Sequence, residues 1–263
     1  MITISVIGAG QVGTQFCKAI KATESLHLEQ LYNRSKIGPE KGLYGVNFCN
    51  DLMQLKPADL YILAVSDSAV ETISNALPFE NRLVVHTSGS VAMRFLNKKN
   101  RKGVFYPLQT FSKTSDLDFI NVPICIETTD KSDRKLLKSV AEALRSPIYF
   151  IQSEQRQSLH LSAVFVNNFT NQLYRIAHEL TDREGLEFDI LKPLMQETIQ
   201  KLQKLSPYMA QTGPAIRNDK KTINQHLKLL ERTPKYQKIY EILTQSIQSV
   251  SYTHLTLPTN REV

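Results

Sequence analysis

ISVIGAGQVGTQF, residues 4–16, contains three glycines and no charged side chain, and this stretch decides the fold of the first half of the chain. The apolar run up to Ile7 has the composition of a buried strand, and the residues after Gly10 repeat apolar side chains at helical spacing. Gly8, Gly10 and Gly13 therefore form a G-x-G-x-x-G pattern at a strand-to-helix junction. Such glycines permit a tight turn, the approach of a ligand to the backbone, and close packing of helix on strand.

This junction predicts a site for a diphosphate. Backbone N–H groups at the start of a helix, together with the helix dipole, bind phosphate oxygens without any charged side chain. A glycine-rich turn without a ligand is the alternative. We favour a dinucleotide site, and the predicted cofactor contacts are Gly8, Ala9, Gly10, Gln11, Val12 and Gly13.

The chain has two halves of different character. Through about residue 151, short β-rich runs alternate with helical patterns, which favours a doubly wound, mostly parallel sheet of the α/β class. From residue 152, apolar residues recur at helical spacing, first up to Gly185 and then over 187–206 and 222–249. We predict a Rossmann-like domain over 1–151, an all-helical domain over 152–250, and a non-native or disordered tail over 251–263.

Composition narrows the classes of partner. The 263 residues include 32 Lys and Arg against 25 Asp and Glu, and the net charge of +7 favours an anionic ligand. The basic residues are scattered rather than interleaved with aromatic residues, so we predict no nucleic-acid partner. No apolar run reaches the ~20 residues of a membrane span, and the three cysteines form no C-x-x-C pair. We expect a cytoplasmic protein with reduced thiols and neither a membrane partner nor a metal site.

The end of the second strand distinguishes the two nicotinamide dinucleotides. There the sequence reads Asn33-Arg34-Ser35, without an Asp or Glu to bind a ribose hydroxyl. The Arg34 guanidinium matches a phosphate group, with Asn33 and Ser35 as further donors, so we predict NADP. A solvated loop charge is the alternative for Arg34.

Two more strands should end at the same edge of the sheet, where ligands of open α/β sheets bind. The first is followed by Asp67, which we interpret as a helix cap. The second ends at His86 and Ser88, close to the expected nicotinamide. His86 could transfer a proton or serve as a structural histidine, and Ser88 could bind substrate or cap a helix. The residues predicted under the cofactor are Ala64, Val65 and Ser66.

The motifs GAGQVG, NRS, AVSDSAV, HTSGS, YPLQTF and TGPAIRND occur in this order, with a long helix containing NNF. Over about residues 1–250 the chain thereby resembles the pyrroline-5-carboxylate-reductase-like and deazaflavin-dependent NADP oxidoreductase-like proteins, and is most similar to a subgroup of poorly defined function. The resemblance implies a helical domain like the C-terminal domain of 6-phosphogluconate dehydrogenase, a homodimer formed through it, and a substrate cleft between the domains. Related β-hydroxyacid dehydrogenases use a lysine and an asparagine on the long helix. With Asn168 at the asparagine position, Val164 stands at the lysine position.

Polar residues on the long helix are further candidates. At 3.6 residues per turn, His160, Asn167 and Asn171 share one face, and Asn168 is offset by about 80°. These side chains could position a substrate, with His160 as proton donor in place of the absent lysine. Hydrogen bonds between packed helices in a buried interface are the alternative.

Two loops complete the predicted site. Gln109 in YPLQTF could contact the ligand. Arg217 in TGPAIRND could bind a substrate carboxylate, or it could pair with Asp219 in an interhelical turn.

We therefore predict an NADP-dependent oxidoreductase that transfers hydride between the nicotinamide and a small polar carbonyl or imine. The alternative is a non-catalytic NADP-binding sensor or interaction protein on the same fold, which the missing lysine favours. The catalytic candidates are His86, His160 and Asn168, and the substrate-binding candidates are Ser88, Gln109, Asn167 and Arg217.

Overall fold

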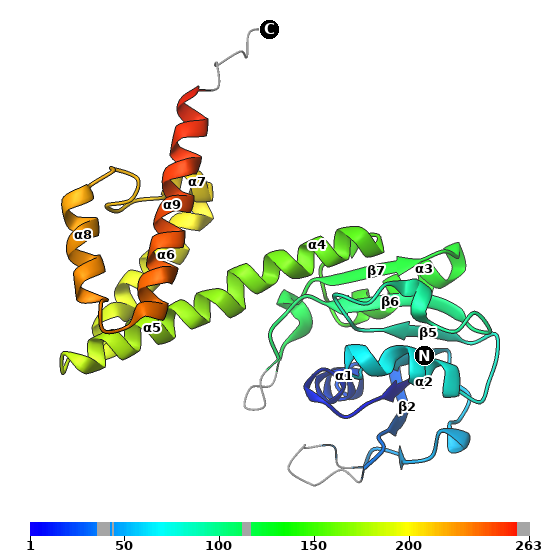
Figure 1. The fold of residues 1–263 in the computed structure, drawn as a ribbon. Coiled ribbons are helices and arrows are strands. Elements are labelled where there is room, and N and C mark those ends of the chain that lie inside the picture. The colour runs from blue at the N-terminus through cyan, green and yellow to red at the C-terminus, as the bar shows by residue number, and fades with distance from the viewer. Residues whose placement is uncertain (36–42, 44, 112–116, 257–263) are drawn as a thin grey trace, which may run out of the picture. The chain divides into compact units, whose positions relative to one another are not determined.

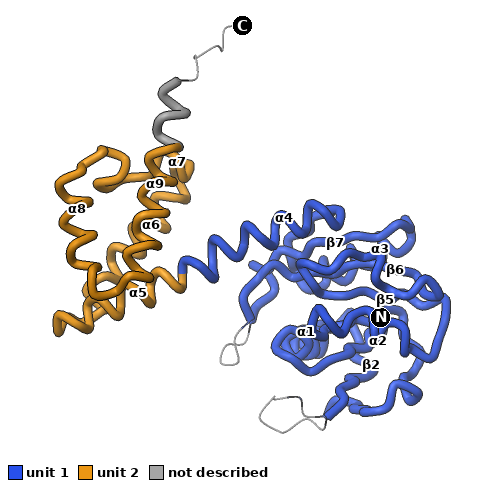
Figure 2. Tube along the Cα trace, viewed as in Figure 1, with its two compact units in different colours: residues 1–170 blue, residues 171–263 orange. Residues whose placement is uncertain are grey.

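The computed structural model of the chain describes residues 1–35, 43, 45–111 and 117–256, with side chains described up to residue 249. The chain divides into two compact units, residues 1–170 and residues 171–263 (Figure 2). The predicted domain limits at residues 151 and 250 stay a prediction. Of the predicted tail, residues 257–263 lie outside the described residues.

The first unit is built on an eight-stranded sheet with the order β3-β2-β1-β4-β5-β6-β7-β8 (Figure 1). Neighbouring strands are parallel except for β6 and β7, which are antiparallel. The predicted doubly wound, mostly parallel sheet is confirmed, whereas β3, with two residues, is too short to show a periodic pattern. The strands are β1 (Ile2–Ile7), β2 (Leu26–Tyr32), β3 (Phe48–Cys49), β4 (Leu60–Leu63), β5 (Leu83–His86), β6 (Arg101–Pro107), β7 (Ile124–Thr128) and β8 (Ile148–Phe150).

Helices cover both faces of this sheet. Phe16 of α1 and Leu137 of α3 join one core cluster with β1, while Val70 of α2 joins a second cluster with other side chains of the sheet. Leu159 of α4 packs against a third cluster that contains Tyr106 of β6. These helices are α1 (Gln11–Lys21), α2 (Val70–Ala76), α3 (Lys131–Ala143) and α4 (Ser153–Ala163), and the short 3-10 turns are η2 (Leu52–Gln54), η3 (Asp67–Ala69), η4 (Met93–Phe95) and η5 (Phe119–Asn121).

The turn between β1 and α1 requires glycine at two of its three glycine positions. Gly8 has φ +109, and a Cβ on it would lie 2.3 Å from the Ala64 carbonyl oxygen. A Cβ on Gly13 would lie 1.9 Å from the Gly8 carbonyl oxygen, because helix and strand pack directly on each other. A Cβ on Gly10 would meet no atom within 4 Å. The structure itself therefore explains Gly8 and Gly13, while Gly10 faces open space.

The second unit is helical, as predicted. The long helical segment is interrupted by a π-helical stretch, η6, and it ends before Gly185, which has φ +68. The helical pattern predicted over 222–249 is divided in two, because Pro234 starts a new helix. The π-helical stretch η6 (Val164–Phe169) still belongs to the first unit. The elements that follow it are α5 (Thr170–Arg183), η7 (Phe188–Leu191), α6 (Lys192–Lys204), α7 (Pro207–Ala210), α8 (Lys220–Leu229) and α9 (Pro234–Thr256). No helix in the described ranges combines the length and the hydropathy of a membrane span.

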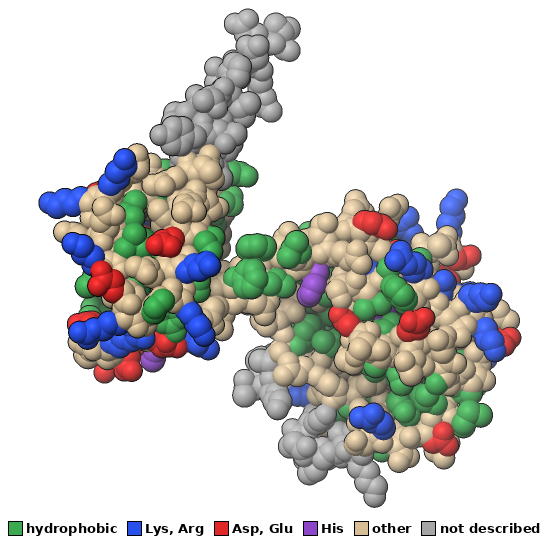
Figure 3. Space-filling view, in the orientation of Figure 1, with side chains coloured by type: hydrophobic (Ala, Val, Ile, Leu, Met, Phe, Trp, Pro, Cys, Tyr) green, Lys and Arg blue, Asp and Glu red, His purple; other side chains and the backbone are tan. Residues whose placement is uncertain are grey.

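The second unit buries very little of its own apolar surface. Within residues 171–249, the only buried side chains are those of Ala215, Leu230 and Thr244. Large hydrophobic side chains are exposed instead, and Ile190, for example, is 69% exposed. Figure 3 shows hydrophobic side chains on the surface of this unit. In a single chain the helices thus lack the core that normally stabilises amphipathic helices.

The glycine turn yields a matched pair of variants. Gly13→Ala should lower the free energy of unfolding by about 3 kcal/mol or more, because its Cβ collides with backbone that cannot move without breaking the turn. Gly10→Ala should cost less than about 1 kcal/mol, because Gly10 has φ −68 and its Cβ would be unobstructed. Urea unfolding of both variants measures the difference, and equal losses would contradict this account of the turn.

Candidate functional site

The start of α1 forms an uncapped group of backbone N–H donors. No side chain caps the helix among the described residues, and its first turn contains no acidic residue. Two hydrogen bonds fix the turn to the end of β2: the Gly8 N–H donates to the Tyr32 carbonyl at 2.8 Å, and the Ala9 N–H donates to Asn33 Oδ1 at 3.1 Å. The open side of the turn, at Gly10, is thus the side from which an anion can approach the predicted residues 8–13.

Asn33, Arg34 and Ser35 follow directly after β2. The Asn33 side chain fixes the loop, because its Nδ2 donates to the Ser35 carbonyl at 2.8 Å while its Oδ1 accepts from Ala9. Arg34 and Ser35 are exposed. The exposed Arg34 guanidinium is therefore accessible to a phosphate. The Asn33 side chain instead stabilises the loop, a role that the sequence did not predict.

The end of β4 lies under the glycine turn. Ala64 is buried; its carbonyl oxygen is the atom nearest to the Gly8 Cβ position, and its Cβ lies 3.2 Å from the Gly13 Cβ position. Val65 and Ser66 follow it toward the surface.

Asp67 does not cap the helix, so this interpretation is wrong. The residue at the capping position of η3 is Ser66, which makes no side-chain cap. The Asp67 carboxylate instead accepts a hydrogen bond from the Ser90 hydroxyl and thereby joins the loops after β4 and β5.

His86 is fully buried at the end of β5. Its Nδ1 accepts from the Ser88 N–H at 3.2 Å, and its Nε2 has no partner among the described residues. Burial, helped by the nearby Arg156 charge, lowers the pKa of His86 to about 3. His86 is thus neutral near pH 7, which favours its structural alternative. The Ser88 hydroxyl accepts from the Ser90 and Val91 N–H groups, which favours the capping alternative for Ser88.

A cavity of about 470 Å³ brings several predicted residues together in the first unit. Gln109, His160, Asn167 and Asn168 line it, together with Val164 at the position of the absent lysine. His86 and Ser88 are not among its lining residues, and Arg217 belongs to the second unit. The complete lining is Tyr106, Leu108, Gln109, Thr110, Leu159, His160, Ser162, Ala163, Val164, Val166, Asn167 and Asn168.

The asparagines reach this cavity through the π-helical stretch. A π turn contains more residues than an α turn, so it rotates the later side chains relative to the earlier ones. The predicted common face of His160, Asn167 and Asn171 assumed a regular α-helix. In the structure Asn168 lines the cavity with His160 and Asn167, whereas Asn171 is not among its lining residues. Such single π turns occur frequently at functional sites.

Sequence reasoning missed Tyr106 as a site residue. Its hydroxyl lies 3.2 Å from His160 Nδ1, and the two rings meet edge to face with centroids 6.1 Å apart. Gly89 packs against both rings, since a Cβ there would lie 2.6 Å from His160 Nδ1. Burial raises the pKa of Tyr106 to about 12. YPLQTF does place Tyr106 near the end of a strand, but only the fold brings it to a histidine 54 residues later.

A buried ion pair positions His160. Arg156, one helical turn earlier, is fully buried and bonds the Glu127 carboxylate of β7. Arg156 also donates, at 2.5 Å, to the carbonyl of Val91 in the segment after β5. The Ser153 hydroxyl bonds Glu127 at 2.9 Å, so the first turn of α4 is attached to the sheet at two points.

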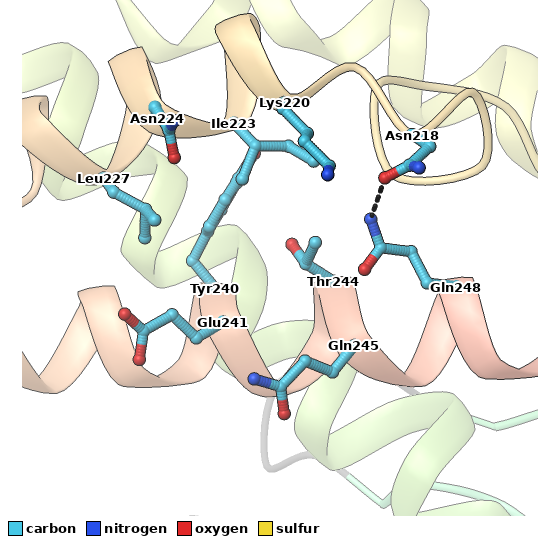
Figure 4. A pocket seen from close by; sticks show the side chains of 10 residues that line it. All are labelled: Asn218, Lys220, Ile223, Asn224, Leu227, Tyr240, Glu241, Thr244, Gln245 and Gln248. Atoms are coloured by element: carbon cyan, nitrogen blue, oxygen red, sulfur yellow. Dashed lines mark hydrogen bonds between the residues drawn. The ribbon is translucent and has the colours of Figure 1, made fainter.

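A second cavity, of about 350 Å³, lies in the helical unit between α8 and α9 (Figure 4). The Gln248 side chain donates to Asn218 Oδ1 at 3.3 Å beside it. Arg217 is exposed in the preceding loop, and the neighbouring Asp219 carboxylate caps α8 by accepting from the Thr222 N–H at 3.1 Å. None of the predicted site residues lines this cavity.

A Rossmann-like sheet with an open helix start, followed by a helical unit, defines the class of two-domain nucleotide-dependent dehydrogenase folds. Comparison with known proteins narrows this class. A family model described as a domain of unknown function (DUF2520) matches residues 122–247. A crystal structure of a "putative NADP oxidoreductase" from Bacteroides fragilis has 40% sequence identity and a TM-score of 0.85, and the alignment covers 94% of this chain and 98% of that chain.

The chain belongs to the family of this Bacteroides protein, which confirms the resemblance to the pyrroline-5-carboxylate-reductase-like and NADP oxidoreductase-like proteins. Two more distant structures share the fold. Protein TM1727 of Thermotoga maritima is 19% identical with a TM-score of 0.72, covering 95% of this chain and 99% of that chain. A 1-pyrroline-5-carboxylate reductase from Streptococcus pyogenes is 12% identical with a TM-score of 0.63, covering 94% and 98%. No curated protein matches the sequence.

The buried state of His86 should appear in the pH dependence of stability. Its pKa is about 3 in the folded protein and about 6.5 when unfolded, so the unfolded chain binds the extra proton as the pH falls through this window. Between pH 7 and pH 5 this group should remove about 2 kcal/mol from the free energy of unfolding. In His86→Gln the decrease should be smaller by that amount. Urea unfolding at both pH values measures it, and parallel decreases would place His86 in contact with solvent.

Proposed function

We propose that the protein is an NADP-dependent oxidoreductase that transfers hydride between the nicotinamide and a small polar carbonyl or imine substrate. The observation that carries this proposal is the turn after β1, where Gly8 and Gly13 bring helix and strand together and Gly10 leaves the uncapped start of α1 accessible. The family relationship to the Bacteroides protein supports it.

The residues of the first unit fit a dinucleotide. Its diphosphate would be held by the backbone of residues 8–13, where a Cβ on Gly10 would meet no other atom and the helix dipole favours negative charge. Ala64, Val65 and Ser66 would support it from the end of β4. Asn33, directly after β2, offers no carboxylate to a ribose hydroxyl, and the adjacent Arg34 would bind the 2′-phosphate with Ser35.

The bound cofactor would supply the hydride, so the chain itself must orient the substrate and provide a proton. The cavity with Gln109, Asn167 and Asn168 offers amide groups that bind a carbonyl or imine through hydrogen bonds. The lining also includes apolar side chains, among them Leu108 and Val164. This combination suits a small, polar substrate with an aliphatic part. Arg217 remains a proposed contact from the helical unit.

A non-catalytic NADP-binding protein is the second candidate. Val164 lines the cavity at the position where the related dehydrogenases have their lysine, so the proton-handling group of those enzymes is absent. A protein that lost turnover would still bind the cofactor through the turn after β1.

We also propose that the protein forms a homodimer through the helical unit. Thirteen large hydrophobic side chains between Leu173 and Leu243 are more than a third exposed, while only two hydrophobic residues of this unit are buried among those described. A helical unit of this size needs a larger buried core to be stable. A second copy of the same surface is the most common way to supply it.

The cofactor choice can be measured by thermal unfolding. NADPH should raise the melting temperature more than NADH at equal concentration, because Arg34 binds the 2′-phosphate and a ligand of the folded state stabilises it. Arg34→Asp should remove or reverse this preference, whereas Arg94→Asp, with a comparable charge change in η4, should leave it unchanged. Equal shifts with both cofactors in the wild-type protein would contradict NADP.

Turnover distinguishes the two candidate functions. NADPH oxidation, followed at 340 nm with a panel of keto acids, cyclic imines and deazaflavins, should be steady with at least one of them. NADPH binding without oxidation across the panel would support the non-catalytic candidate.

The dimer can be tested by sedimentation equilibrium. The wild-type chain should have twice the monomer mass, and Leu194→Glu should shift it toward the monomer and lower its melting temperature, because Leu194 is 64% exposed on α6. Met53→Glu, at a 73% exposed position of the first unit, is the matched control and should remain dimeric. A monomeric wild-type protein with a stable helical unit would overturn this proposal.

A further inference from the structure

We propose that Tyr106 is the proton donor of the 470 Å³ cavity and that His160 passes the proton to it. This inference rests on the proposed oxidoreductase function and assigns the proton route of that site. It replaces the sequence-based candidate His86 and gives His160 an indirect role.

The contact between the two side chains is built into the fold. Tyr106 Oη and His160 Nδ1 are 3.2 Å apart, and both residues line the cavity. Gly89 permits this contact, since a Cβ there would lie 2.6 Å from His160 Nδ1 and 2.9 Å from Tyr106 Cζ. Any larger residue at position 89 would separate the pair or displace the loop.

No other lining residue is suited to donate the proton. Besides Tyr106 and His160, the polar lining consists of the amides of Gln109, Asn167 and Asn168 and of the hydroxyls of Thr110 and Ser162. Amides and aliphatic hydroxyls are far weaker acids than a phenol or an imidazolium. His86 is neutral and is not a lining residue.

The surroundings of Tyr106 keep it protonated. Burial is the main cause that raises its pKa to about 12, the Cys125 thiol adds to this, and the Arg156 charge opposes it. The Asp67 carboxylate also raises the pKa of this phenol. A phenol with this pKa carries its proton near pH 7 and is still a stronger acid than the alcohol that forms when a carbonyl is reduced.

The proton balance of the step is simple. As the hydride reaches the carbonyl or imine carbon, the Tyr106 O–H proton moves to the substrate oxygen or nitrogen. The His160 Nδ1–H proton then moves to the Tyr106 oxygen while water donates a proton to Nε2 of the partly exposed ring, so the imidazole stays neutral, and proton exchange with solvent restores the Nδ1–H form. One hydride from the reduced nicotinamide and one proton from water are consumed in each turnover. For this route His160 must donate from Nδ1, so that the Tyr106 O–H is free to face the cavity.

The first test is a comparison of conservative variants on the substrate found with the NADPH panel. Tyr106→Phe should lower kcat by about 100-fold or more, with unchanged NADPH affinity and little change in KM. His160→Gln should lower kcat with KM again unchanged. Tyr149→Phe, at a 54% exposed tyrosine of β8, is the matched control and should retain full kcat.

The second test needs no turnover. A long-range ¹H–¹⁵N spectrum of the NADPH-bound protein, with the His160 signals assigned by their loss in His160→Gln, should show a proton on Nδ1 near pH 7. In Tyr106→Phe the Nδ1 signal should move, because its acceptor is gone. A His160 Nδ1 without a proton would overturn the relay.

The outcomes separate this inference from the proposed function. Full kcat in a folded Tyr106→Phe variant would overturn Tyr106 as donor and leave the oxidoreductase function standing. Failure of the wild-type protein to bind NADPH would instead overturn the proposed function, and with it the need for a proton donor.

Discussion

The buried ion pair between Arg156 and Glu127 is the interaction on which the site depends. Arg156 is fully buried and bonds Glu127 of β7 and the Val91 carbonyl, so one side chain joins α4, the sheet and the segment after β5. Removing one partner of such a pair leaves a buried charge uncompensated, which is strongly destabilising. His160 follows one turn later on the same helix, so the position of α4 that this pair fixes also fixes the distance between His160 and Tyr106.

A second constraint acts at the turn after β1. The turn after β1 is held by steric necessity rather than by charge, because Gly8 and Gly13 leave no room for a Cβ. Asn33 then fixes the turn to the end of β2 through Ala9. A rigid turn whose donors are already oriented loses little entropy when it binds an anion, which suits a diphosphate site without charged side chains.

The helical unit differs from the first unit, because few of its hydrophobic side chains are buried within one chain. Its helices follow the amphipathic pattern of the sequence, yet Ala215 and Leu230 are the only buried hydrophobic residues among those described there. A pattern of apolar residues reveals that a face will be buried, but not what buries it. This is why the sequence predicted helices correctly and why the partner of those helices remains a proposal.

The sequence by itself determined the glycine turn and the order of all strands except the two-residue β3, because both depend on short-range spacing and on backbone sterics. It also identified His160, Asn167 and Asn168 as candidate polar residues among Leu, Val and Phe side chains of the long helix. Only the tertiary structure decided which of them share a cavity, since the π turn changed the helical register, and it decided that Tyr106 meets His160 while His86 is buried. Contacts between residues distant in sequence depend on how the elements pack, and no local pattern records them.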